Sequence, residues 1–181
     1  MRALAAAVAL ILVAGCGGDP AKEAPPAPKP VMGVARLTPK NSSTVRGFIS
    51  FTQKGDKVEI AGDFFELYSG PHSLYIHEVG NCSSPNAASA GPVWNVSGNT
   101  SGKRTGDLRQ LRVGSEGHAE FSYATTDISV GTGKPNDVIG HSVVVHATVD
   151  LDPKPEFGVR NGWLACGVIQ RSEGLDLKDI L

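Results

Sequence analysis

The chain has 181 residues, a formal net charge of −1 and an aromatic content of only 6%. This near-neutral balance excludes the basic surface of a nucleic-acid-binding protein, and no apolar run reaches the roughly 18 residues needed to span a membrane. Three cysteines and five histidines are the residues most able to form disulfides or bind metal.

Residues 1–16 are predicted to be a lipoprotein signal peptide. Arg2 supplies the positive n-region, and the apolar stretch 3–15 supplies the h-region. The sequence VAGC at 13–16 resembles the lipobox of bacterial lipoproteins, which implies cleavage before Cys16 and attachment of lipid to its thiol. An ordinary secretory signal that ends near a cysteine is the alternative. With Gly17 next, the resemblance implies a lipid-anchored protein of the bacterial cell envelope, in the outer membrane and facing the periplasm or the cell surface.

Three segments follow the signal. Residues 17–31 are rich in proline and alanine and predict a semi-rigid tether between the membrane and a domain. Residues 32–170 are expected to form one domain of ordinary size, and residues 171–181 a C-terminal tail.

The domain is predicted to be all-β. Short runs rich in β-branched and aromatic residues alternate with turn clusters, and no sustained 3.6-residue period is present. The predicted strands are 33–37, 45–53, 58–67, 72–78, 108–113, 118–124, 141–148 and 163–170. Eight short strands at fairly even spacing predict a Greek-key β-sandwich or flattened barrel. The long connections 79–107 and 149–162 are candidate functional loops.

Six motifs, in order along the chain, resemble the copper/zinc superoxide dismutase family. They are VRGFISF (45–51), SGPHSLYIHEVGNC (69–82), SAGPVWN (89–95), TGDL (105–108), VIGHSVVVHA (138–147) and LACGVI (164–169). The resemblance covers roughly 33–170 and implies the sandwich fold of that family. A cysteine five residues after His77 is similar to the bacterial periplasmic branch, which implies a disulfide between Cys82 and Cys166. Cysteine counting agrees, since lipidation of Cys16 leaves these two free to pair in an oxidising compartment rather than act as ligands.

The family's metal ligands are carried over only in part. Members bind copper through four histidines and zinc through three histidines and an aspartate, with one histidine shared. By resemblance, His77 and His146 keep copper positions and Asp107 keeps a zinc position. The substituted ligand positions are Tyr75 at a copper histidine, Val93 at the shared histidine and Arg104 at a zinc histidine; Trp163 replaces the arginine that guides superoxide.

These substitutions make zinc binding unexpected. A structural zinc site needs about four ligands, and a guanidinium cannot be deprotonated to serve as one. Arg104 can instead pair with Asp107. The sequence therefore predicts a superoxide dismutase-like envelope lipoprotein with a degenerate metal centre and little or no dismutase activity.

Copper binding is left open. Two imidazoles with a nearby phenol can bind copper, because imidazole is a suitable ligand for it. The alternatives are therefore a hydrogen-bonded core pair of His77 and His146, a copper-only dismutase or copper-binding protein that uses them with Tyr75, and a copper-delivery lipoprotein. No particular protein partner or oligomeric state is predicted.

Overall fold

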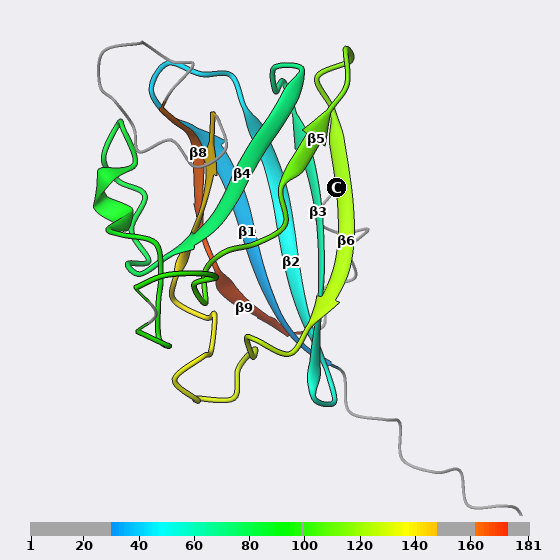
Figure 1. The fold of residues 1–181 in the computed structure, drawn as a ribbon, viewed down its shortest axis with the longest axis vertical. Helices are drawn as coiled ribbons and strands as arrows, with labels where there is room; N and C mark the ends of the chain where they lie inside the picture. The colour runs from blue at the N-terminus through cyan, green and yellow to red at the C-terminus, as the bar shows by residue number, and fades with distance from the viewer. Residues whose placement is uncertain (1–29, 99, 148–161, 174–181) are drawn as a thin grey trace, which may run out of the picture.

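The computed structural model describes residues 30–98, 100–147 and 162–173, and Figure 1 draws the remainder in grey. The predicted signal peptide with Cys16, nearly all of the tether and most of the 149–162 connection lie outside the described residues. Within the described ranges, no helix is long and apolar enough to cross a membrane.

The described part of the chain is built from nine strands and one short 3-10 helix. They are β1 (Val31–Pro39), β2 (Arg46–Lys54), β3 (Lys57–Phe65), β4 (Gly70–His77), η1 (Ala88–Ala90), β5 (Leu111–Val113), β6 (Ala119–Thr125), β7 (Ser142–His146), β8 (Trp163–Val168) and β9 (Gln170–Glu173).

The strands form two layers joined through β1. The pairing order is β5-β4-β7-β8-β1-β2-β3-β6, all of these pairs are antiparallel, and β9 also pairs with β1. In Figure 1, β4 crosses in front of β1 and β2, with β6 at the right edge. The outer strands β5 and β6 approach each other, so the sheet nearly closes into a flattened barrel. The predicted all-β Greek-key sandwich is confirmed.

Alternation within the strands explains the core. In β3, the residues Val58, Ile60 and Phe64 are buried, whereas Lys57 and Glu59 are exposed. Side chains of successive strand residues point to opposite faces, so this alternation buries one face between the layers. The hairpin from β2 to β3 has a two-residue turn, and glycine suits its first position because the backbone there has φ of +61°.

The strand boundaries differ from the sequence prediction in two main places. Strand β9 occupies 170–173, where a tail was expected from 171, and pairs with residues 31–34 of β1. The sequence QRSE is polar and has no apolar alternation, so only the open edge of β1 determines this pairing. The fifth strand is also shorter than expected, since β5 begins only at Leu111. Leu108 lies in the loop before it, where its N–H donates to Leu74 O of β4.

The outer face of the β4-β7-β8 layer is covered by the segment 78–98, which includes η1 (Figure 1). Beneath it lies a second apolar cluster of Ala87, Ala90, Val144 and Cys166, separate from the main core. The predicted disulfide between Cys82 and Cys166 is present and attaches this segment to β8. The candidate metal positions lie on the same face.

Candidate metal centre

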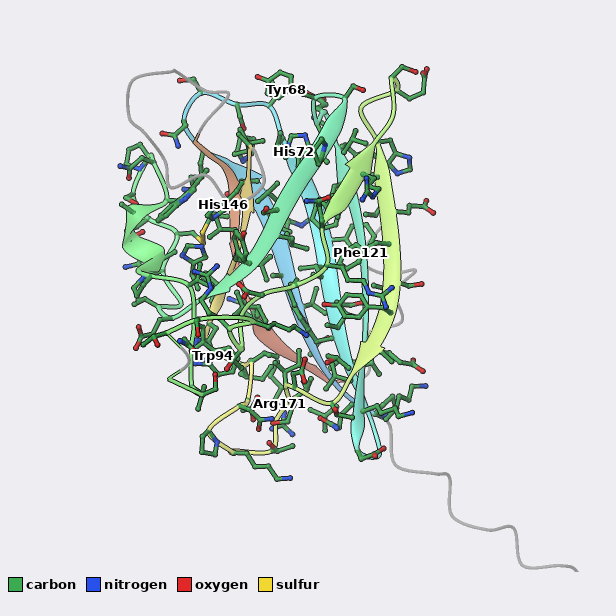
Figure 2. The ribbon with its side chains drawn as sticks, viewed as in Figure 1. Tyr68, His72, Trp94, Phe121, His146 and Arg171 are labelled. Carbon is green, nitrogen blue, oxygen red and sulfur yellow. A yellow bond between two sulfur atoms is a disulfide. The ribbon has the colours of Figure 1, made fainter. Side chains whose placement is uncertain are left out.

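Three neighbouring strands position the candidate centre. His77 is the last residue of β4, His146 ends β7, and Trp163 begins β8 directly opposite His146 in the register. Residues 73, 75 and 77 of β4 share one face because side chains alternate along a strand. Figure 2 shows His146 on the side of the molecule that carries η1.

The rings of His77 and His146 meet edge to edge. Their Nε2 atoms are 3.2 Å apart. His77 Nδ1 lies 2.7 Å from Gly91 O, and a carbonyl oxygen can only accept, so the proton of a neutral His77 is on Nδ1. Its Nε2 therefore carries a lone pair, which accepts the N–H of His146 Nε2.

Burial keeps both rings neutral. The pKa of His146 is lowered to about 3, mainly by removal of the ring from water, and the nearby His77 and Arg104 contribute to the same shift. Burial is also the main cause that lowers the pKa of His77, whereas its bond to Gly91 opposes the shift. Neutral imidazoles form a stable N–H···N pair, and they are also the form that a metal ion requires.

Aromatic side chains enclose the pair. The ring of Tyr75 lies edge-on to His146, with centroids 4.7 Å apart, and Tyr75 is only 8% exposed. Trp163 contacts both imidazoles, with ring centroids 4.9 Å from His77 and 5.4 Å from His146. The position that the family resemblance assigns to a guiding arginine thus holds an uncharged ring packed on the histidines.

Arg104 and Asp107 form the ion pair expected from the sequence. Arg104 Nε lies 2.9 Å and Nη2 2.8 Å from Asp107 Oδ1, while Arg104 N donates to Oδ2 at 2.6 Å. The guanidinium also lies over the ring of Tyr75, 5.2 Å from its centroid. Asp107 is therefore neutralised by a side chain three residues away.

The covering segment completes the site through its backbone. Val93 forms an isolated antiparallel bridge with His77, and Asp107 forms one with Tyr75. Trp94 N donates to Ile76 O at 2.9 Å. The positions that resemblance assigns to the shared histidine and the zinc aspartate are consequently held against β4 by main-chain hydrogen bonds.

The donor set does not fit zinc at the family's position. All five histidines of the chain lie in the described residues, and three of them are engaged elsewhere: His72 with the carbonyls of Tyr68 and His146, His141 with Glu78 O, and His118 with Asp63. Asp107 faces a guanidinium. A tetrahedral zinc site needs about four ligands, and this arrangement supplies one carboxylate beside a fixed cation.

Two imidazole nitrogens, those of His77 and His146, could bind copper. At metal–nitrogen bond lengths of about 2.0–2.1 Å, two imidazole nitrogens on one tetrahedral ion lie about 3.3 Å apart, close to the 3.2 Å between the two Nε2 atoms. Within the described ranges, no third histidine, cysteine or carboxylate joins them in a cluster. The pair can therefore supply half of the four imidazoles that the family uses.

Two features escaped the sequence reasoning. The Gly91 carbonyl that orients His77 is a backbone group, and no sequence signal points to it. The second feature is a cluster of Asp63, His118 and Glu120 on the opposite side of the barrel. Here a signal was present, because His118 and Glu120 are spaced to share one face of a strand.

Comparison with known proteins points to one family. The family model of copper/zinc superoxide dismutase (SODC) matches residues 45–169. Superoxide dismutase [Cu-Zn] 2 of Brassica juncea is 33% identical over 150 residues, which cover 76% of this chain and 95% of the relative. The matched region contains every candidate position from Tyr75 to Trp163.

Proposed function

Because the chain belongs to the copper/zinc superoxide dismutase family, we propose that it is a member that keeps the fold without the zinc site and has little or no dismutase activity. Its metal centre is replaced by side-chain interactions that need no ion. The protein then serves the envelope as a folded domain rather than as an enzyme.

The observation that carries this proposal is the pairing of Arg104 with Asp107. Both Nε and Nη2 of the guanidinium lie within 2.9 Å of Oδ1. Charged hydrogen bonds of this kind are among the strong ones in proteins. The arginine provides the positive charge that a zinc ion would otherwise bring to this carboxylate, and it keeps the 104–108 loop ordered beside β4.

The histidine pair supports the same proposal. A neutral His77 already has its Nδ1 proton on Gly91 O and its Nε2 lone pair on His146. Tyr75 and Trp163 pack against the rings. These hydrogen bonds involve protein groups alone, so the histidine pair does not require an ion.

An activity assay of the metal-loaded protein tests this function. The full chain is purified, loaded with copper and zinc, desalted and assayed for superoxide dismutation. We expect the rate to equal that of a His77→Gln/His146→Gln control, because any residual activity then comes from loosely held copper. A rate near that of a complete family member, abolished in the control, would overturn the proposal.

Residual copper binding is the second candidate function, and the 3.2 Å separation of the two Nε2 atoms favours it. Titration with Cu(II) under electron paramagnetic resonance distinguishes the two. An imidazole-type signal that disappears in both His77→Ala and His146→Ala supports copper binding. The signal has to persist in His118→Ala, because that histidine lies in a separate cluster. No such signal, or one that both substitutions leave unchanged, excludes this candidate.

The proposal includes a lipid anchor at Cys16 and a place in the bacterial envelope. Its support is the VAGC sequence behind an apolar leader. Expressed in a bacterial host, the full chain should partition into the detergent phase of a membrane extract, since lipid chains supply the affinity for the bilayer. A Cys16→Ser variant should not. Equal partitioning of the two would refute the anchor while leaving the proposal for the metal centre intact.

A further inference from the structure

A second group of side chains that carry possible metal-ligand atoms lies on the outside of β3 and β6. One ligand atom each from Asp63, His118 and Glu120 lies within 4.8 Å of the other two. In Figure 2, Phe121 on β6 marks this side of the barrel, opposite the side that carries His146. The group therefore shares nothing with the centre described above.

The register of the two strands brings these residues together. Asp63 pairs directly with Glu120 in the antiparallel ladder. His118 directly precedes β6 and lies two positions before Glu120, and residues two apart along an extended chain share a face. In β3, Asp63 belongs to the outward-facing set that includes Glu59, because the residues beside it are buried. All three side chains thus emerge on one outer face.

Electrostatics makes this grouping unfavourable without a cation. Two carboxylates directly opposite each other on paired strands destabilise a sheet. The imidazole of His118 lies between them, with Nε2 2.5 Å from Asp63 Oδ1 and 3.9 Å from Glu120 Oε1. Its nitrogen therefore lies where a metal ion would contact both carboxylates.

The histidine ring is oriented before any ligand arrives. It stacks on Phe65, with centroids 4.9 Å apart and an interplanar angle of 15°. Asp63 is 17% exposed, and Glu120 is 74% exposed and free to adjust. A stacked ring directly before β6 and a half-buried carboxylate on β3 lose little freedom when they bind an ion.

A hollow borders the group. Asp63 and Glu120 line it together with Phe48, Ala61, Gly62, Phe121 and Ser122, and its volume is about 490 Å³. An ion held by three protein ligands keeps a coordination position for water or a small anion, as in zinc sites of the open type. The hollow provides room for that fourth ligand.

We propose that Asp63, His118 and Glu120 form a surface binding site for a divalent transition-metal ion, with zinc as the ion of choice. One imidazole and two carboxylates are a donor set that zinc accepts. On binding, the Nε2 lone pair of neutral His118 goes to the metal, and any proton on that nitrogen is released to solvent. The site is independent of the loss of zinc at the family's position.

Calorimetric titration of the full, metal-free chain with zinc alone tests the site. We expect one zinc to bind and the affinity to fall by about tenfold or more in Asp63→Asn and in His118→Gln, by analogy with losses at supporting ligands. Glu120→Gln is expected to weaken binding as well, and this exposed substitution leaves the fold intact.

Glu59→Gln is the matched control. It removes one carboxylate from the same outward face of β3, about 13 Å along the strand from Asp63, and its partner in the structure is Lys54. Zinc affinity should be unchanged in Glu59→Gln and in His146→Gln. Nuclear magnetic resonance should show the ring signals of His118 moving on zinc addition.

Three results would overturn the proposal. They are the absence of zinc binding, binding that is unchanged in both Asp63→Asn and His118→Gln, and binding that is lost in His146→Gln. The last would place zinc at the family's centre and would also contradict the proposed function, whereas the first two would leave that function standing.

Discussion

Acidification of the metal-free protein should destabilise it through the buried histidine pair. The pKa of His146 is lowered to about 3, mainly by burial, whereas an unfolded chain has a histidine pKa of about 6.5. Between these values the unfolded chain binds a proton that native His146 does not. The free energy of unfolding therefore stays level above pH 6.5 and falls as the pH decreases below it.

The size of the effect follows from the shift. At pH 5, about 1.5 units below the unfolded pKa, His146 alone should remove about 2 kcal/mol relative to neutral pH, at about 1.36 kcal/mol per unit. The lowered pKa of His77 acts in the same direction. Asp127 and Asp137 also have lowered pKa values. The stability that these two carboxylates contribute is lost only as the pH falls below about 4, the ordinary pKa of an aspartate. They therefore contribute little to the change between pH 7 and pH 5.

Urea unfolding at pH 7, 6 and 5 measures this, with His146→Gln as the control. The glutamine amide nitrogen can take the place of ring Nε2 opposite His77, but it does not titrate. Between pH 7 and pH 5, the wild type should lose about 2 kcal/mol more stability than the variant. Equal pH dependence of the two proteins, or a wild type that is more stable at pH 5, would refute the reasoning.

Three further tests concern the surroundings of the site. Cys82→Ala/Cys166→Ala removes a disulfide that joins residues with a sequence separation of 84. Chain entropy predicts that the free energy of unfolding, measured with urea, falls by about 4.5 kcal/mol. A fall of less than about 1 kcal/mol would contradict this prediction. Arg104→Met should lower the free energy of unfolding by up to about 1 kcal/mol, since the ion pair with Asp107 is partly exposed. It should also raise the pKa values of His77 and His146, measured by nuclear magnetic resonance titration. Unchanged pKa values would show that the charge of Arg104 does not affect the two histidines. Gly106→Ala places a Cβ 2.3 Å from a carbonyl oxygen of β4 and should cost about 1–3 kcal/mol, whereas Gly114→Ala meets nothing within 4 Å and should be neutral. Equal stability of these two alanine variants would show that a Cβ at position 106 is not crowded by the backbone of β4.

The sequence was most informative where the physics is local. Alternation of apolar and polar residues has a period of two, so it determined the inward face of β3 and placed Tyr75 and His77 on one face of β4. Cysteine counting and the family resemblance predicted the pairing of Cys82 with Cys166. The Arg104–Asp107 pair was also accessible, because only three residues separate its members.

The tertiary structure decided everything that depends on which strands become neighbours. His77 and His146 are 69 residues apart, and only the pairing of β4 with β7 brings their Nε2 atoms to 3.2 Å. Trp163 reaches them because β8 is the next strand in the layer. No local period predicts such contacts, because register and strand order are set by how the whole sheet closes around its core.

The same reason explains why strand β9 and the cluster of Asp63, His118 and Glu120 were not predicted from the sequence. Strand β9 has no apolar alternation, and its position follows from the unpaired edge of β1. His118 and Glu120 were recognisable as sharing a strand face, but Asp63 joins them only through the register between β3 and β6. The sequence by itself determined the fold class and the chemistry of each position. Strand pairing determined which of those positions meet, because contacts between distant segments depend on the packing of the complete barrel.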